Sequence, residues 1–336
     1  MRCYTVDGTS LEQLLLGERP TPTMGAGDVL VAVHAVSLNY RDLLVVDGRY
    51  GGPQDPPIIP VSDMAGEVLA VGDEVTAFSP GDRVLNAPFR HWPAGNLRRD
   101  WSKTFVGGQR VDGVLAEEVV FPADALVPVP AHLSYAEAST LTVAGLTAWA
   151  AIVTHGKTRP GDWVLLHGSG GVSIFGAQLA KLLGARTILT TASAEKASLV
   201  KERFAVDQTI DYTDEDWPRQ VQKLTGGGVN VVVEVAGGES LQRSIDACAY
   251  GARIGLIGVL SGASSSIDVF TMLMRQITIR GIYMESTEEL QALARAVDTG
   301  GIRPYIDRAF PFEQAREAYE YLASQQHVGK VIVEVR

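Results

Sequence analysis

The stretch with the clearest capacity for chemistry is a glycine-rich loop with the sequence HGSGGVS, residues 167–173. A short apolar run before it predicts a strand buried on both faces, and apolar residues at helical spacing follow it. Gly168, Gly170 and Ser173 therefore stand where a dinucleotide-binding loop has small residues for a tight turn, for close approach of a pyrophosphate and for helix–strand packing. The predicted cofactor contacts in this loop are Gly168, Ser169, Gly170, Gly171 and Val172.

The residues that follow the next predicted strand bear on the choice of cofactor. Roughly 20 residues past the loop, where an NAD site has an acidic residue for the ribose 2′-hydroxyl, the chain has Thr191. Ser193 can donate a hydrogen bond there and Lys196 can supply positive charge, so the pattern favours NADP(H). Tyr212, after the following strand, is a further candidate for the same pocket.

Composition and charge exclude several other classes of function. The chain of 336 residues is 46% hydrophobic and 20% charged, with a net charge of −10. That charge, without any long basic cluster, argues against a nucleic-acid partner. No apolar run approaches the length of a membrane span, and the first residues do not resemble a secretory signal, so we expect a cytoplasmic protein. Two cysteines, Cys3 and Cys248, are too few for a disulfide framework or a four-cysteine zinc site.

The elements that must position these residues change in type along the chain. Short β-branched runs between Gly and Pro turns fill the first third, which predicts a mostly antiparallel β domain. From about residue 140, strands alternate with amphipathic helices, as in a parallel sheet covered on both faces. The fold class is therefore α/β with a second, β-rich domain.

Several blocks together resemble the medium-chain dehydrogenase/reductase superfamily: NYRDLL, PPIIPVSDMAGEVLAVGDEVTAFSPGDRV, the glycine loop and GKVIV. The resemblance implies a GroES-like catalytic domain over residues 1–140, completed by 286–336, and a Rossmann doubly wound domain over 141–285. It also implies an active site in the cleft between the domains.

Residues at the metal-ligand places of that superfamily assign the subfamily. Zinc members carry Cys-His where this chain has Asn39 and Tyr40, and Gly-His-Glu where it has Val61, Ser62 and Asp63; the usual third ligand falls near Val143. We therefore expect no metal, and the chain resembles the zinc-independent, quinone-oxidoreductase-like members.

The expected reaction is hydride transfer from NADPH to a quinone or an α,β-unsaturated carbonyl, a small-molecule acceptor that spreads the arriving charge. Tyr40, Asn39 and Ser62 are the predicted catalytic donors, while Asp42 and Asp63 are expected to brace the loops. The predicted apolar wall of the substrate pocket consists of Phe89, Trp92 and Met284.

Further cofactor contacts follow from matching blocks: Val235, Ala236, Gly237, Gly258, Val259, Ser286 and Lys330. Two alternatives stay open, a carbonyl reductase acting on simple aldehydes and an NADPH-binding protein with little turnover. The β-prone run RQITIRGIYM predicts a long edge strand, and pairing of that edge predicts a homodimer.

Overall fold

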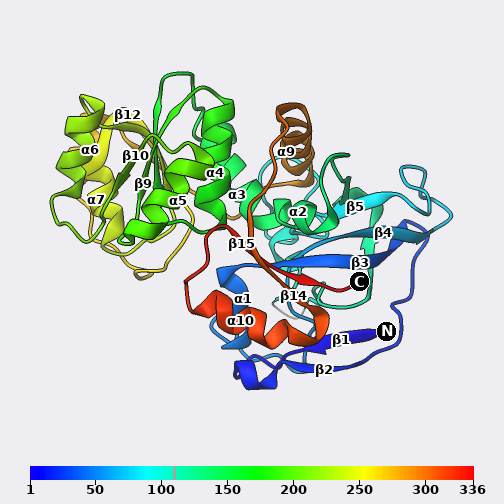
Figure 1. The fold of residues 1–336 in the computed structure, drawn as a ribbon. Helices are drawn as coiled ribbons and strands as arrows, with labels where there is room; N and C mark the ends of the chain where they lie inside the picture. Colours follow the sequence, from blue (N-terminus) through cyan, green and yellow to red (C-terminus); the bar gives the residue numbers. More distant parts are fainter. Residues whose placement is uncertain (109–110) are drawn as a thin grey trace. The chain divides into compact units, whose positions relative to one another are not determined.

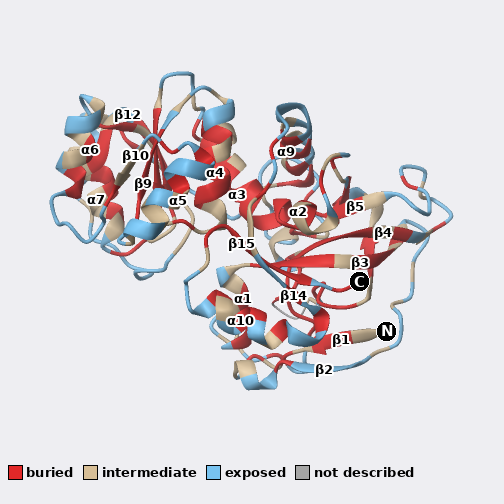
Figure 2. Cartoon of the chain, viewed as in Figure 1, coloured by how far each residue is buried: buried red, intermediate tan, exposed pale blue. Residues whose placement is uncertain are grey.

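The computed structural model describes residues 1–108 and 111–336, which form two compact units (Figure 1). One unit contains Met1–Leu146 together with Glu285–Arg336, and the other contains Thr147–Met284. In both units, buried residues run along the strands of the main sheet (Figure 2). Each unit therefore has a core of its own.

The unit of Thr147–Met284 is built on a parallel sheet with the strand order β10-β9-β8-β11-β12-β13. This is the order of a doubly wound dinucleotide-binding fold, as expected. Its strands are β8 (Trp163–His167), β9 (Arg186–Thr190), β10 (Gln208–Ile210), β11 (Val229–Glu234), β12 (Cys248–Leu256) and β13 (Thr278–Gly281). The loops after β8, β9 and β11 start at one edge of the sheet, because parallel strands end on the same side.

Helices cover both faces of this sheet. Alternate strand residues point to opposite faces, so Leu165 packs in a core with α6 and α7, while Leu166 lies beside α4 and the π-helical segment η5. Central strands covered in this way are apolar at nearly every position. The helical elements of the unit are the later part of α3 (Leu146–Trp149), η5 (Ala150–Thr154), α4 (Gly171–Leu182), α5 (Ala194–Phe204), α6 (Trp217–Thr225), α7 (Ser240–Ala247) and α8 (Val269–Arg275).

The edge strand is shorter than the sequence predicts. The run from 275 to 284 suggests a long strand, but only Thr278–Gly281 pairs with β12. Gln276 adopts the left-handed conformation that ends α8, and β12 stops at Leu256, the partner of Gly281. The Ile282 N–H still donates to the Leu256 carbonyl at 2.9 Å, and β13 ends level with its partner strand.

The other unit is built on a sheet with the order β14-β15-β3-β4-β5-β7, and β6 also pairs with β3. Only β14 and β15 are parallel, so the sheet is mostly antiparallel, as predicted. Its strands are β3 (Asp28–Leu38), β4 (Asp63–Val71), β5 (Arg83–Asn86), β6 (Glu118–Pro122), β7 (Leu126–Pro128), β14 (Ile306–Pro311) and β15 (Lys330–Glu334), with a separate hairpin of β1 (Arg2–Thr5) and β2 (Leu15–Glu18).

Helical segments and the end of the chain complete this unit. The strands β14 and β15 bring the C-terminal segment into the sheet, where β15 pairs with β3. The helical elements are α1 (Tyr40–Val46), α2 (Tyr135–Ser139), η4 (Leu141–Gly145), the start of α3, α9 (Thr287–Gly300), α10 (Ala315–Ala323) and the short turns η1 (Leu11–Gln13), η2 (Trp101–Thr104), η3 (Ala123–Ala125) and η6 (Phe312–Gln314). Within the described part of the chain, no helix is both long and apolar enough to cross a bilayer.

Candidate functional site

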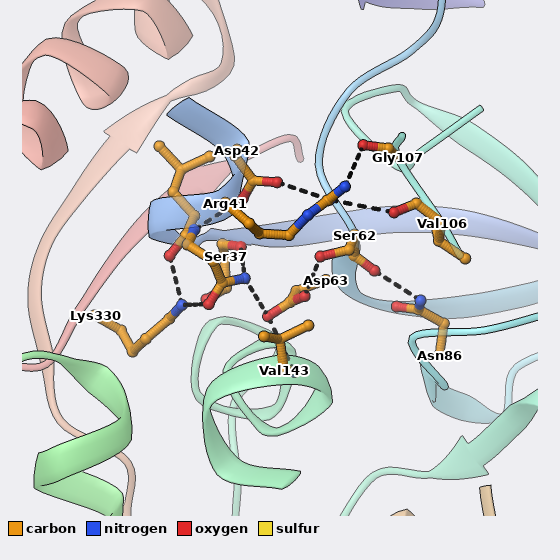
Figure 3. Close-up of polar contacts among 12 residues, drawn as sticks. Ser37, Arg41, Asp42, Ser62, Asp63, Asn86, Val106, Gly107, Val143 and Lys330 are labelled. Carbon is orange, nitrogen blue, oxygen red and sulfur yellow. Dashed lines mark hydrogen bonds and ion pairs between the residues drawn. The ribbon is translucent and has the colours of Figure 1, made fainter. Parts of the chain in front are cut away.

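A buried carboxylate, Asp63, binds groups from three separate segments of the unit that contains Met1–Leu146 and Glu285–Arg336 (Figure 3). Its Oδ2 accepts hydrogen bonds from Asn39 Nδ2 at 2.9 Å and from the Val143 backbone N–H at 3.3 Å. Its Oδ1 accepts from Ser62 Oγ at 2.7 Å. The end of β3, the start of β4 and the segment η4 therefore meet at one carboxyl group.

The strand register explains this meeting. In the antiparallel pair β3–β4, Ser37 lies opposite Asp63, so the residues that follow β3 begin beside the start of β4. Asn86, from β5, fixes the loop before β4: its side chain accepts from the Met64 N–H at 2.9 Å and donates to the Ser62 carbonyl at 2.8 Å. Asn39, Ser62 and Val143, which the resemblance assigns to the zinc-ligand positions, are thus brought together by backbone pairing and side-chain hydrogen bonds.

Lys330 enters the same cluster from the opposite end of the chain. It is the first residue of β15, whose next residue, Val331, pairs with Leu38. Its Nζ donates to the Leu38 carbonyl at 2.5 Å and to Asn39 Oδ1 at 2.6 Å. The side chain is almost wholly buried, so its ammonium faces protein groups.

Arg41 and Asp42 form an ion pair beside this cluster. Asp42, fully buried in the first turn of α1, accepts from the Asn39 N–H at 2.8 Å and from Arg41 Nη1 at 3.0 Å. The Arg41 guanidinium also donates to the carbonyl of Gly107 at 2.9 Å. It lies over the rings of Tyr50 and Phe105, at 4.9 and 4.3 Å from their centroids. This pair fixes the start of α1 against the loop that contains Gly107.

The cluster balances two acidic groups against two basic ones in a buried setting. Burial raises the pKa of Asp63 to about 6, although the Lys330 ammonium and the hydrogen bonds from Asn39 and Ser62 act in the opposite direction. Burial also raises the pKa of Asp42, against the charge of Arg41. Burial lowers the pKa of Lys330, against the charges of Asp63 and Asp42. Each carboxylate thus keeps a cation close enough to offset part of its cost of desolvation.

The predicted catalytic donors differ in whether protein acceptors already bind their hydrogens. The Asn39 amide donates to Asp63 and, at 3.4 Å, to the Ser37 carbonyl. The Ser62 hydroxyl donates to Asp63, and Ser62 is fully buried. Tyr40 is 36% exposed, and its hydroxyl has no hydrogen-bond partner among the described residues. Of the three, Tyr40 alone retains a donor that could meet a substrate.

The predicted apolar wall lies in two different units. Phe89 and Trp92 are buried, with ring centroids 5.3 Å apart in an edge-to-face arrangement. The ring centroid of Phe105 lies 5.0 Å from that of Phe89. The indole N–H of Trp92 donates to the Gly95 carbonyl at 2.8 Å. Met284 is also buried, but it is the last residue of the unit Thr147–Met284.

The glycine loop has the local geometry of an anion site. Gly168 has a φ of +69°, a conformation that L side chains rarely adopt. Apart from the adjoining residues of the chain, no heavy atom of the described residues lies within 4 Å of the place a Cβ would occupy at Gly168 or Gly170. Gly170 precedes α4 and no side chain caps that helix, so its first N–H groups have no intrahelical acceptor. Ser173, buried in the first turn, donates to the His167 carbonyl at 2.7 Å. A serine therefore serves at the third small-residue position.

The residues after β9 lie at a second helix start. Thr191 follows the last residue of β9 directly, and its Oγ1 accepts from the Ser193 N–H at 3.2 Å. Ser193 is the N-cap of α5, and its Oγ accepts from the Lys196 N–H at 3.2 Å. Tyr212 is 48% exposed after β10. The place expected for an acidic ribose contact is thus occupied by a threonine next to a serine cap.

The other predicted cofactor contacts are divided between the units. Val235, Ala236 and Gly237 follow β11, and Gly258 and Val259 come shortly after β12. Ser286 lies in the other unit as the buried N-cap of α9, where its Oγ accepts from the Glu289 N–H at 3.4 Å. Lys330 belongs to the buried cluster around Asn39.

Comparison with known proteins agrees with this organisation. Residues 25–131 match the alcohol dehydrogenase GroES-like domain family, and residues 171–299 match the zinc-binding dehydrogenase family. A zinc-type alcohol dehydrogenase-like protein of Schizosaccharomyces pombe is 35% identical, over 97% of this chain and 96% of that protein. The chain belongs to the medium-chain dehydrogenase/reductase superfamily. A quinone oxidoreductase-like protein 2 homolog of Nematostella vectensis is 29% identical over 94% of this chain and 84% of that protein.

Solved structures of superfamily members extend the comparison to cofactors. An NAD-dependent alcohol dehydrogenase has a TM-score of 0.89 and 33% identity, covering 100% of both chains. A mycobacterial protein complexed with NADPH has a TM-score of 0.83 and 27% identity, again covering 100% of both chains. This medium-chain dehydrogenase/reductase is therefore an oxidoreductase of a superfamily that uses nicotinamide cofactors, and both cofactor types occur among its structural neighbours.

The residues present fit a nicotinamide dinucleotide better than a metal ion. The open backbone at Gly168 and Gly170 and the uncapped start of α4 suit a pyrophosphate. Among residues 1–108 and 111–336, no three His, Cys, Asp or Glu side chains gather closely enough to hold a metal ion. Asn39, Ser62 and Val143, the residues that the resemblance assigns to the zinc-ligand positions, donate hydrogen bonds to Asp63.

Sequence reasoning missed the direction in which Lys330 points. The block GKVIV gives no signal for it, because the inward direction follows from the pairing of β15 with β3 across almost the whole chain. Asn86 was also not singled out from the sequence. A polar residue inside the apolar strand RVLN was the available signal, because a buried amide needs partners.

Proposed function

We propose that this protein is an NADPH-dependent, metal-independent oxidoreductase that reduces a quinone or an α,β-unsaturated carbonyl. When bound, NADPH supplies the hydride. The chain's own residues would bind the acceptor, orient it and stabilise the charge that the hydride brings.

The observation that carries the proposal is the commitment of Asn39 and Ser62 to Asp63. With their donors engaged, Tyr40 is left as one neutral donor for the substrate oxygen. An isolated carbonyl that receives a hydride becomes a localised alkoxide, which needs strong stabilisation from a metal or several donors. A conjugated acceptor spreads the same charge over several atoms, so a single tyrosine hydroxyl suffices.

In this proposal Asn39 and Ser62 act on the substrate through Tyr40. Asn39 precedes Tyr40 directly, and its amide is held by Asp63 and Lys330 while its backbone N–H is held by Asp42. These bonds fix the start of α1 and with it the position of the tyrosine. Phe89, Trp92 and Met284 remain the proposed apolar contacts of the acceptor.

The proposed preference for NADPH rests on Thr191, Ser193 and Lys196. None of these carries a negative charge that would repel a 2′-phosphate, and a lysine on the first turn of α5 adds to the positive end of the helix. Gly168 to Val172 are proposed to hold the pyrophosphate. Val235, Ala236, Gly237, Gly258 and Val259 are proposed to receive the nicotinamide half.

A carbonyl reductase is the second candidate, because relatives of the chain are described as alcohol dehydrogenases. The two activities give different products from crotonaldehyde. Reduction of the conjugated double bond yields butyraldehyde, whereas reduction of the carbonyl yields crotyl alcohol. We expect gas chromatography to show butyraldehyde formed with stoichiometric oxidation of NADPH, after exhaustive chelation as well as before it. Crotyl alcohol as the main product would favour the carbonyl reductase, and activity lost on chelation would contradict metal independence.

We also propose that the protein is a homodimer formed through the β13 edge and α8. Four apolar side chains on α8 are at least half exposed, at 52–70%: Val269, Phe270, Leu273 and Met274. A second copy that pairs along β13 would cover both the open strand edge and this apolar face.

A further inference from the structure

Buried polar side chains form a continuous chain of hydrogen bonds at the ends of three neighbouring strands in the unit Thr147–Met284. His167 ends β8, Thr190 ends β9 and Glu234 ends β11. Nδ1 of His167 lies 3.1 Å from Thr190 Oγ1, and its Nε2 lies 2.8 Å from Ser244 Oγ and 3.3 Å from Glu234 Oε2. All four side chains are buried. These side-chain hydrogen bonds therefore link the ends of β9, β8 and β11 at the point where the loops begin, in addition to the backbone hydrogen bonds of the sheet.

The two oxygens of Glu234 face different parts of the fold. Oε1 accepts the backbone N–H groups of Ala236 at 2.8 Å and Gly237 at 3.0 Å, in the loop that follows β11. Oε2 accepts from Ser244 Oγ at 2.5 Å, on α7. One carboxylate thus holds the loop from one side and is itself held by a helix and by His167 from the other.

The carboxylate keeps its charge despite burial. Burial by itself favours the neutral form, but the interaction with His167 and the hydrogen bonds from His167, Ser244 and the Gly237 N–H outweigh it and lower the pKa of Glu234 to about 2. Hydrogen bonds from the loop to Glu234 are therefore charge-assisted, and such bonds are about twice as strong as neutral ones.

The loop that Glu234 holds has little room to move. Gly237 has a φ of +66°, and a Cβ on Gly258 would collide with the carbonyl oxygen of Val235. The Ala236 carbonyl accepts from the Ser261 N–H at 2.7 Å, so the loops after β11 and β12 lie backbone against backbone. Small changes in the direction of the Ala236 and Gly237 amides would shift both loops together.

We propose that Glu234 is a positioning residue for the nicotinamide end of the cofactor. Through Ala236 and Gly237 it sets the loop that receives the nicotinamide ring, while Ser244 and His167 hold the carboxylate from the other side. The inference rests on the proposed cofactor function, and it adds a residue that touches no cofactor itself.

Two ligands separate this role from a purely structural one: NADPH, and 2′-phospho-ADP-ribose, which lacks the nicotinamide half. For Glu234→Gln we expect the Kd of NADPH to rise about tenfold, because the loop that receives the nicotinamide half is no longer held in its binding position, while the Kd of 2′-phospho-ADP-ribose changes less than about twofold. Glu239→Gln is the matched control, because Glu239 is an exposed residue of the same loop. It should leave both constants unchanged.

The outcomes are distinguishable. Equal weakening of both ligands in Glu234→Gln, or weakening of neither, overturns the positioning role while the proposed function stands. Wild-type protein that binds neither ligand overturns the proposed function itself. If Glu234→Gln does not fold, amide exchange of the wild-type protein without cofactor decides: we expect slow exchange at Ala236 and Gly237, and rapid exchange there would show that Glu234 does not hold the loop.

Discussion

The ammonium of Lys330 lies 2.6 Å from Oδ1 of Asn39, although 291 positions separate the two residues in the chain. The same amide donates through Nδ2 to Asp63. A cation from the last strand therefore fixes the residue directly before Tyr40. In zinc members a metal ion would supply positive charge at this place. In this account Lys330 supplies it instead, and its ammonium donates to the Leu38 carbonyl and to Asn39 Oδ1.

Removal of that cation should destabilise the protein strongly. Lys330→Met would leave the buried carboxylates of Asp63 and Asp42 with less compensating charge, and a buried charge that loses its compensating partner costs about 3–5 kcal/mol. Urea unfolding of wild type and variant measures the loss. Lys181→Met, an exposed lysine on α4, is the control and should change stability by less than about 0.5 kcal/mol. Equal stability of Lys330→Met and the control would show that the buried cation is not needed.

The raised pKa of Asp63 predicts a pH dependence with a definite sign. Its pKa is about 6 in the folded protein, against about 3.9 in an unfolded chain. Between about pH 4 and pH 6 the folded state holds a proton that the unfolded chain has lost, so the contribution of Asp63 to the free energy of unfolding falls as pH rises, by about 3 kcal/mol.

Asp63→Asn removes this titration. Urea unfolding gives the free energy of unfolding of wild type and of Asp63→Asn at each pH. The value for wild type minus the value for Asp63→Asn should be larger near pH 4.5 than near pH 7. A difference that is constant, or that grows with pH, would contradict the raised pKa.

The sequence predicted the parts of the fold that depend on local patterns. The glycine loop between an apolar strand and a helix was visible because turn, strand and helix signals are all short-range, and β8 and α4 lie on either side of it. The mostly antiparallel sheet followed from β-branched runs between turns. These features need no knowledge of distant residues.

The arrangement around Asn39 could not be predicted in the same way. Which donors remain available depends on the register of β3 with β4 and β15, and therefore on pairings between residues far apart in the chain. The length of β13 was overestimated for a related reason, because its end is set by the end of its partner β12. Glu234 was missed because the role of a carboxylate at the end of an apolar strand depends on hydrogen-bond partners that the sequence does not show.

Cofactor preference should depend on Lys196. If its ammonium meets a 2′-phosphate, Lys196→Ala should weaken NADPH binding by about 1.5–3 kcal/mol, or one to two decades in Kd, and leave NADH binding almost unchanged. Fluorescence titrations of both cofactors measure this. Lys201→Ala, an exposed lysine on the same helix, is the matched control. Wild-type protein that binds NADH as tightly as NADPH would contradict the proposed preference.

The apolar face of α8 predicts the oligomeric state. Light scattering at micromolar concentration should give twice the chain mass of 36.0 kDa. The double variant Phe270→Asp, Leu273→Asp places two charges on that face and should give a monomer, because a charge buried at an interface is costly. Leu182→Asp, an exposed leucine of α4 in the same unit, should remain a dimer. A monomeric wild type, or a double variant that stays dimeric, would show that this face is not the interface.

The most direct test of the account is a steady-state comparison of crotonaldehyde with butyraldehyde, its saturated counterpart, using NADPH. Because one tyrosine donor cannot replace a metal or a full oxyanion site, we expect kcat/KM for crotonaldehyde to exceed that for butyraldehyde by a factor on the order of a hundred or more. Tyr40→Phe should lower kcat/KM for crotonaldehyde by a factor equivalent to about 1–3 kcal/mol of transition-state stabilisation, without changing NADPH affinity. Tyr250→Phe, at an exposed tyrosine, should leave kcat/KM unchanged. If butyraldehyde is the better substrate, or if Tyr40→Phe reduces crotonaldehyde as fast as wild type, the proposed reaction is contradicted.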